Sequence, residues 1–80
     1  MVIDEAIERR LAYYVAEKNI RSFILKVSPI LGAYLSKGMF SSILGKWKTK
    51  YKCKIKLVEI TDFTVLQNEF YTENGDRLDA

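Results

Sequence analysis

Residues 39–57 read MFSSILGKWKTKYKCKIKL, and the fold of the chain depends on how this stretch is interpreted. Lysine occupies every second position from Lys46 to Lys56, and strict alternation of this kind is typical of a half-buried strand. The same stretch also carries a helical stripe, because its large apolar side chains recur at spacings of three or four residues: Phe40, Ile43, Leu44, Trp47 and Tyr51.

The two patterns are reconciled by a helix that is followed by a strand. A single strand from Lys46 to Val58 would exceed the usual strand length and would leave the apolar residues before it without an element. A serine at position 41 or 42 can cap a helix by accepting a hydrogen bond from a backbone N–H. The sequence therefore predicts a helix from about Ser41 to Lys50 and a strand from about Lys52 to Ile60.

Upstream of this stretch, periodicity predicts two helices with a strand between them. Apolar residues at three- and four-residue spacings indicate a helix over Ile3–Lys18, and an apolar run indicates a largely buried strand over Ile20–Val27. Ser28 is suited to cap a second helix, with Pro29 at its first position. Gly38 is expected to end that helix.

Downstream, one more strand is predicted over Thr64–Tyr71, and Asn74-Gly75 is a turn signal. The connection at residues 61–63 is short, so we expect the last two strands to pair antiparallel. The expected fold is a single α+β domain over residues 1–80, in the order helix, strand, helix, helix, strand, strand. Its small, mainly antiparallel three-stranded sheet would pack against the helices.

Composition places the chain among globular proteins, with 80 residues, 49% hydrophobic and 29% charged. The apolar runs are far shorter than the roughly 18–20 residues that cross a bilayer, so no membrane partner is expected. Asp4 and Glu5 stand where a signal peptide needs positive charge, which favours a cytoplasmic location.

The residue types needed for catalysis are scarce. The sequence has no histidine and one cysteine, Cys53, which excludes an internal disulfide, a Cys–His nucleophile and a Ser–His–Asp triad. The acids are scattered, and the glycines form no phosphate-binding loop. We expect no catalytic residue, no metal site and no cofactor, so the chain alone is not an enzyme. Cys53 is interpreted as a small buried residue in a strand.

Charge is divided unevenly along the chain. Residues 37–56 hold seven lysines and no acid, whereas residues 57–80 hold six acids and a single arginine, Arg77. Basic side chains interleaved with aromatic rings can hold single-stranded RNA through phosphate contacts and base stacking. The candidate RNA-binding residues are Lys46, Lys48, Lys50, Lys52, Lys54, Lys56, Trp47 and Tyr51.

A plainer interpretation of the same residues stays open. Trp47 and Tyr51 lie on the apolar stripe and suit a core, while the lysines suit a solvated face or a strand edge protected from aggregation. Further apolar residues suit either a protein interface or an ordinary core: Tyr13, Tyr14, Tyr34, Met39 and Phe40.

The stretch FILKVSPILGAYL at residues 23–35 resembles the strand and helix that open the C-terminal small domain of the ribonuclease E/G endoribonucleases. The stretch LQNEFY at residues 66–71 resembles the tail of ribonuclease G-like members. The similarity is carried by apolar pattern and turn residues over nearly the whole chain, including residues 37–42, 47–48, 51–52, 55–58 and 73–75.

The resemblance implies a non-catalytic accessory domain of an RNA-processing endoribonuclease. Family members cut single-stranded RNA with Mg²⁺ held by aspartates in a DNase I-like domain, aided by an S1 domain and a cysteine zinc link. All of these would lie upstream, so the chain would be a C-terminal fragment, and no catalytic or metal residue is carried over to it. The small domain supports subunit assembly, so the implied partners are the rest of the nuclease or another subunit. The lysine-rich residues add single-stranded RNA as a candidate partner.

Two alternatives remain. Strand, helix, helix, strand, strand is also the core order of a KH-type RNA-binding module, which grips RNA with a GXXG loop between its helices. Here that junction, residues 36–41, contains the single glycine Gly38, so this interpretation ranks lower. The third possibility is a scaffold protein without RNA binding, which lysines pointing in scattered directions would favour.

Overall fold

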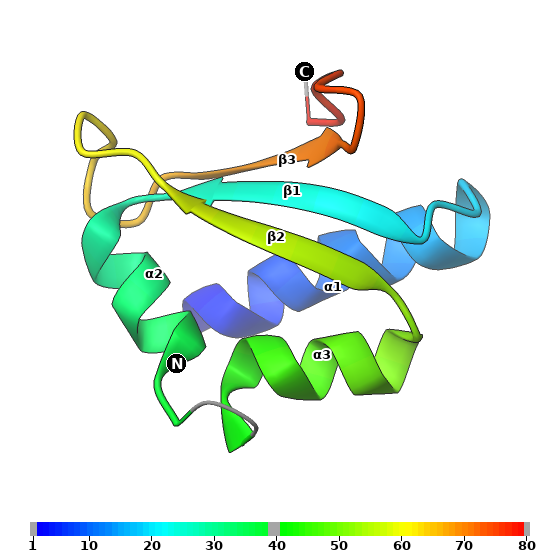
Figure 1. Cartoon of the computed structure of the whole chain (residues 1–80), viewed down its shortest axis with the longest axis horizontal. Helices are drawn as coiled ribbons and strands as arrows, with labels where there is room; N and C mark the ends of the chain where they lie inside the picture. Colours follow the sequence, from blue (N-terminus) through cyan, green and yellow to red (C-terminus); the bar gives the residue numbers. More distant parts are fainter. Residues whose placement is uncertain (1, 39–40, 80) are drawn as a thin grey trace.

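The computed structural model describes residues 2–38 and 41–79, and in it three helices pack on one face of a three-stranded sheet (Figure 1). The elements in chain order are α1 (Val2–Glu17), β1 (Ser22–Val27), α2 (Pro29–Ser36), α3 (Ile43–Tyr51), β2 (Lys54–Glu59) and β3 (Asn68–Thr72). The predicted α+β class, with a three-stranded sheet packed against helices, is confirmed.

The decisive stretch forms a helix and then a strand, as predicted. The Ser42 side chain caps α3 by accepting a hydrogen bond from the Gly45 N–H at 2.9 Å. The helix stops at Lys52, whose φ of 51° puts it in the left-handed region, and β2 begins two residues later. Phe40, the first residue of the predicted stripe, and Met39, an expected interface or core residue, lie outside the described residues.

The sheet is mixed, and the expectation of a mainly antiparallel sheet was wrong. The strand order is β2-β1-β3, with β1 parallel to β2 and antiparallel to β3. The last two strands therefore do not pair with each other, because β1 lies between them. The helices α2 and α3 supply the long crossover that a parallel pair requires.

The segment between β2 and β3 is longer than predicted. Thr64 to Gln67 forms a turn, closed by the Gln67 N–H donating to the Thr64 carbonyl at 3.0 Å, so β3 begins at Asn68 and not at Thr64. The Ser28 N–H donates to the Gln67 carbonyl, and the Ile60 N–H donates to the Val27 carbonyl. These bonds carry the chain past the end of β1 to its other edge.

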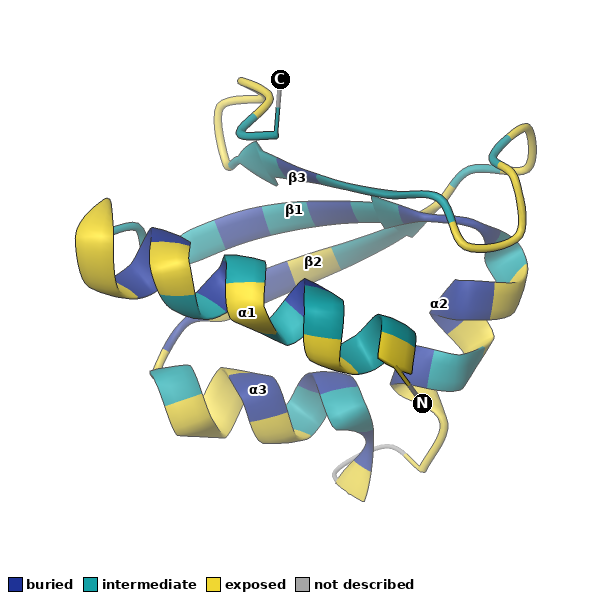
Figure 2. Ribbon diagram, turned by 180° about the vertical axis from the view of Figure 1, so that it is seen from behind, coloured by how far each residue is buried: buried dark blue, intermediate teal, exposed yellow. Residues whose placement is uncertain are grey.

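The core lies between the sheet and the helices (Figure 2). Alternate residues of β1 are buried on the helix side, namely Phe23, Leu25 and Val27, and Leu25 stands opposite Phe70 of β3. The other buried hydrophobic residues are Ile7, Leu11, Tyr14, Val15, Leu31, Leu35, Leu44, Trp47, Cys53 and Ile55. Cys53 is buried as expected, although it lies just before β2 and not within it.

The C-terminal segment covers the outer edge of β3. The Leu78 N–H donates to the Phe70 carbonyl at 2.9 Å, and the Thr72 N–H donates to the Asp76 carbonyl at 2.8 Å. The predicted turn at Asn74-Gly75 makes this return possible, since Gly75 adopts a φ of 94°. Over residues 2–38 and 41–79, no helix combines the length and the apolar composition needed to span a bilayer.

Candidate nucleic-acid interface

The face of the sheet opposite the helices carries a mixed set of polar, basic and aromatic side chains. In β1 these are Ser22, Ile24 and Lys26, which alternate with the buried residues. Directly paired residues share a face of a sheet, so the register extends this set to both neighbouring strands. Lys54, Lys56 and Val58 of β2 and Glu69 and Tyr71 of β3 lie on the same open face.

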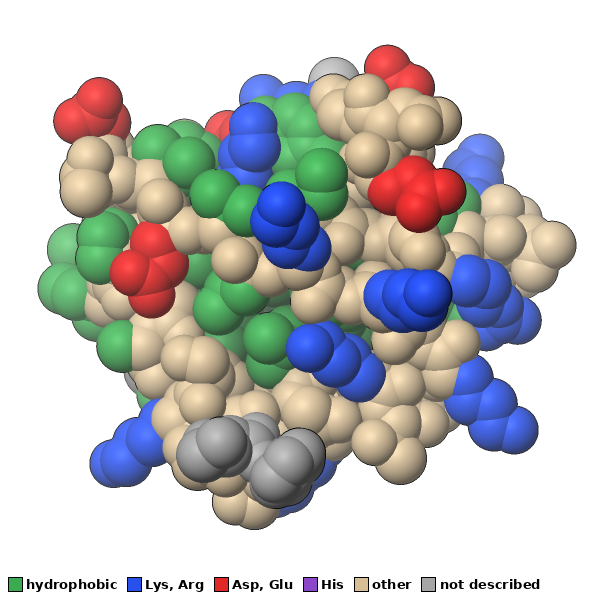
Figure 3. Space-filling view, in the orientation of Figure 1, with side chains coloured by type: hydrophobic (Ala, Val, Ile, Leu, Met, Phe, Trp, Pro, Cys, Tyr) green, Lys and Arg blue, Asp and Glu red, His purple; other side chains and the backbone are tan. Residues whose placement is uncertain are grey.

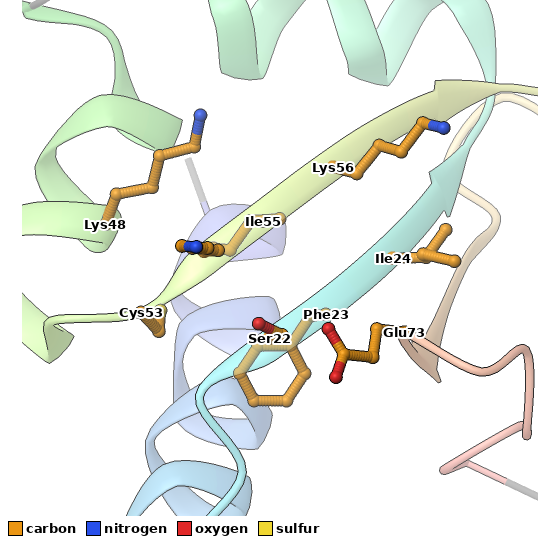
Figure 4. A pocket seen from close by; sticks show the side chains of 9 residues that line it. Ser22, Phe23, Ile24, Lys48, Cys53, Ile55, Lys56 and Glu73 are labelled. Atoms are coloured by element: carbon orange, nitrogen blue, oxygen red, sulfur yellow. The ribbon is translucent and has the colours of Figure 1, made fainter.

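Three lysines from two elements surround one open pocket of about 420 Å³, called the basic pocket here. Lys48 comes from α3, while Lys54 and Lys56 come from β2; Glu73 lies on the far side of β1 (Figure 4). Basic side chains also gather over β2 and α3 in the space-filling view, with hydrophobic side chains between them (Figure 3). The remaining lining residues are Ser22, Phe23, Ile24, Cys53 and Ile55.

The other lysines of the predicted set lie elsewhere. Lys46 and Lys50 line a separate pocket beside α1, and the Lys50 Nζ lies 2.8 Å from the Glu8 Oε2. Lys52 forms the left-handed end of α3. The structure thus brings together three of the six predicted lysines and places the other three elsewhere. Lysines pointing in scattered directions would favour a scaffold protein, and here only half of them are scattered.

The ion pair at Glu8 changes the protonation equilibria of both partners. Hydrogen bonds from Lys50 and Tyr51 hold the pKa of the Glu8 carboxyl below its usual range, against the opposing effect of burial. The same carboxylate raises the pKa of the Lys50 ammonium. Lys50 therefore stays protonated and its charge is paired with Glu8 within the domain.

The two predicted stacking residues do not face the basic pocket. Trp47 is only 3% exposed and belongs to the core, as the plainer interpretation of the sequence expects. The Tyr51 hydroxyl donates a hydrogen bond to the Glu8 Oε2 at 2.6 Å, on the α1 side of α3. Neither ring lines the basic pocket, so neither can stack on a base held there.

A different aromatic residue lies on the open face and was missed from the sequence. The Lys26 Nζ lies 4.2 Å from the centroid of the Tyr71 ring, and the Tyr71 hydroxyl donates to the Glu69 Oε1 at 2.6 Å. That hydrogen bond is the main cause of a lowered pKa at Glu69, to which Arg77 also contributes. The alternation in each strand indicated which residues share a face, but the wrong strand pairing concealed that Tyr71 adjoins Ile24.

The Cys53 thiol is among the side chains that line the basic pocket. Burial raises the pKa of the Cys53 thiol, although Arg21 and Lys48 oppose the change, so the sulfur stays protonated at neutral pH. In the part of the chain that the structure describes, no three cysteine, aspartate or glutamate side chains gather as metal ligands would. Exposed ammonium groups beside an apolar floor can hold an anion.

The junction between α2 and α3 has one glycine in a conformation that favours it. Gly38 adopts a φ of 93°, and the Ser41 hydroxyl donates to its carbonyl at 3.0 Å. Ser41 stands where a GXXG loop beginning at Gly38 would have its second glycine. A side chain there restricts the close approach of an RNA backbone that such a loop provides.

Comparisons with protein-family models, curated proteins and solved structures found no match to the chain. The likeness to the ribonuclease E/G small domain therefore rests on the residues quoted from the sequence. The geometry of the open face is an independent basis for a functional proposal.

Proposed function

We propose that the chain is a non-catalytic accessory domain of a ribonuclease E/G-like RNA-processing endoribonuclease. It binds single-stranded RNA weakly through Lys48, Lys54 and Lys56 and assists the assembly of subunits. The observation that carries the RNA-binding part is that these three lysines line one open pocket, in which Glu73 is the single acid among the described lining residues.

The electrostatics of the basic pocket favour an external anion. Among the described residues, Lys48, Lys54 and Lys56 form no ion pair, whereas Arg10, Lys50 and Arg77 each do. Like charges that share a surface repel one another, and a phosphate group relieves that repulsion when it binds. Each phosphate contact also releases a counterion from the RNA, so the binding should weaken as salt rises.

The first prediction concerns the salt dependence of this binding. Fluorescence anisotropy of a labelled 12-nucleotide single-stranded RNA, measured over a series of salt concentrations, gives the slope of log affinity against log salt. Each lysine–phosphate contact on a single strand contributes about 0.7 to that slope, so three contacts give about 2. The triple variant K48Q/K54Q/K56Q should bind more weakly and lose most of the slope.

A matched variant, K37Q/K46Q/K52Q, removes the same charge from lysines outside the basic pocket. It should keep the slope and most of the affinity. If both triple variants lose affinity equally, only net charge matters and the basic pocket is not the site. Cleavage of the RNA by the purified chain in Mg²⁺ would contradict a non-catalytic role.

The KH-like alternative places RNA at the junction between α2 and α3. It is favoured by the positive φ of Gly38 and by the exposed Lys37 and Lys46 on either side of the junction. The same experiment separates the two proposals, because a KH-like module should lose affinity in K37Q/K46Q/K52Q and keep it in K48Q/K54Q/K56Q.

The assembly part of the proposal is supported by exposed apolar side chains at the opposite end of the sheet. Ile30 is 64% exposed, Val65 57% and Leu66 49%. Ser28 joins their two segments, since its N–H bonds Gln67 and its hydroxyl donates to the Val65 carbonyl. Exposed apolar side chains on adjoining segments are typical of protein interfaces.

A further inference from the structure

We propose that RNA crosses the open face of the sheet with an unpaired base stacked on Tyr71 and with its phosphates at Lys54 and Lys56. The domain would then select unpaired strands over duplex RNA. This inference rests on the proposed RNA binding and adds the part of the RNA that is recognised.

The sheet register places the required groups in one row. Ile24 of β1 pairs with Lys56 of β2 on one side and with Tyr71 of β3 on the other. Neighbouring strands lie about 4.8 Å apart, so the backbones of Lys56 and Tyr71 are separated by about 10 Å. Across the open face the row therefore presents a cation, an apolar side chain and an aromatic ring. This sequence of groups is complementary to the phosphate, sugar and base of one nucleotide.

The ring of Tyr71 is held in position and remains partly exposed. Its hydroxyl is fixed by the hydrogen bond to Glu69, whose charge is offset by Arg77 at 3.4 Å. The Lys26 ammonium lies over one face of the Tyr71 ring, so that face is accessible to a cation from solvent. A stacked base interacts with a tyrosine more strongly than an exposed ammonium does. The base would therefore displace Lys26, which then becomes available to a phosphate.

The path of the RNA backbone over the sheet follows from the positions of the lysines. Lys54 and Lys56 are two residues apart on β2, so their side chains project about 6.7 Å from each other along the strand. Lys48 of α3 lines the same pocket. A sugar–phosphate backbone that follows β2 keeps its bases over Ile24 and Tyr71. In an A-form duplex the base faces are stacked inside the helix and cannot reach a tyrosine on a sheet.

The second prediction separates base recognition from charge attraction. The probes are the labelled 12-nucleotide RNA, the same sequence as a duplex, and inorganic polyphosphate of similar charge. Tyr71→Leu should lower the affinity for single-stranded RNA about tenfold, the loss expected for one stacked base, and leave polyphosphate binding unchanged. Tyr71→Phe keeps the ring and should therefore bind single-stranded RNA more tightly than Tyr71→Leu does, although it loses the hydrogen bond that positions the ring. Because both variants lose the hydrogen bond to Glu69, the comparison isolates the ring.

The result also distinguishes this inference from the proposal on which it rests. If no probe binds the unsubstituted chain, RNA binding itself is wrong. If all three probes bind equally and Tyr71→Leu changes nothing, RNA binding stands and base stacking is wrong. Nuclear magnetic resonance of the unsubstituted chain gives a second readout that needs no variant to fold. The Tyr71 ring resonances should shift with single-stranded RNA and not with polyphosphate, and unshifted resonances would overturn the inference.

Discussion

At the scale of single residues, Asp79 fastens the end of the described chain to the first helix. Its carboxylate accepts hydrogen bonds from the Phe70 N–H at 2.6 Å, from Arg10 at 2.9 Å and from the Tyr14 hydroxyl. Burial and the adjacent Asp79 raise the pKa of Tyr14 to about 12, so the phenol remains a donor at neutral pH. Burial raises the pKa of Asp79, but the three donors outweigh it and the pKa is lowered.

The third prediction is that Asp79→Asn destabilises the domain at pH 7 and not in acid. Hydrogen bonds to a charged group contribute about 1.5–3 kcal/mol, so the free energy of unfolding should fall by about 2 kcal/mol at pH 7. Because the folded pKa of Asp79 lies below the unfolded value of about 3.9, the stabilisation is full above that value. It is lost as pH falls through the folded pKa, where the two proteins should become equally stable.

Urea unfolding at pH 7 and at pH 2.5 measures this difference. Asp76→Asn is the matched control, because Asp76 lies in the same segment with an exposed side chain. An equal loss from the two substitutions, or a loss from Asp79→Asn that persists unchanged at pH 2.5, would show that the carboxylate is not the stabilising group.

At the scale of elements, local signals were sufficient for the helices and insufficient for the pairing of strands. The caps Ser28 and Ser42 and the three- and four-residue spacings are properties of neighbouring residues, so they could be recognised in the sequence. The predicted glycine cap of α2 was wrong, because Lys37 is the C-cap and Gly38 instead turns the chain toward Ser41.

Strand order depends on where the eight residues between β2 and β3 carry the chain. Those residues contain the 64–67 turn, which was predicted as part of a strand. Thr64, Val65 and Leu66 are compatible with a turn as well as with a strand, so their residue types did not separate the two.

The fourth prediction compares the serine caps of α2 and α3. Ser28 accepts a hydrogen bond from the Leu31 N–H at 3.2 Å and also donates to the Val65 carbonyl, whereas the Ser42 side chain accepts from the Gly45 N–H and forms no second hydrogen bond with residues 2–38 or 43–79. Removing an N-cap costs about 1 kcal/mol. Ser28→Ala also leaves the Val65 carbonyl without its donor, so it should cost about 1 kcal/mol more than Ser42→Ala.

Chemical denaturation of the two alanine variants tests this order. Ser28→Gly and Ser42→Gly are useful partners, because glycine is itself tolerated at an N-cap and costs only a few tenths of a kcal/mol there. The excess loss at Ser28 should therefore persist in the glycine pair. Equal losses at the two serines would mean that the bond to the 64–67 turn contributes nothing to stability.

At the scale of the whole molecule, the sequence predicted a basic surface but not its composition. The run of lysines was evident, yet the division into Lys48, Lys54 and Lys56 on one side and Lys46 and Lys50 on the other depends on how α3 packs against α1. The row containing Tyr71 depends on the pairing of β1 with β3, which was predicted wrongly. Asp79 contacts Tyr14 and Arg10, which precede it in the sequence by 65 and 69 positions. No local sequence pattern indicates contacts over such a separation.

The fifth prediction concerns association of the domain through its apolar end. Ile30, Val65 and Leu66 lie on two segments that Ser28 holds together, away from the basic pocket, so the proposed interface and the proposed RNA site do not overlap. If this end is an interface, sedimentation velocity over rising protein concentration should show association of the unsubstituted chain. Ile30→Gln and Val65→Gln together should shift it to the monomer. Tyr13→Gln, which changes an apolar residue of similar exposure on α1, should leave association unchanged.

The three substituted positions, Ile30, Val65 and Tyr13, are each at least half exposed. The variants should therefore unfold at nearly the same temperature as the unsubstituted chain. A chain that stays monomeric at every concentration, or association that Tyr13→Gln abolishes equally, would remove Ile30 and Val65 from the interface.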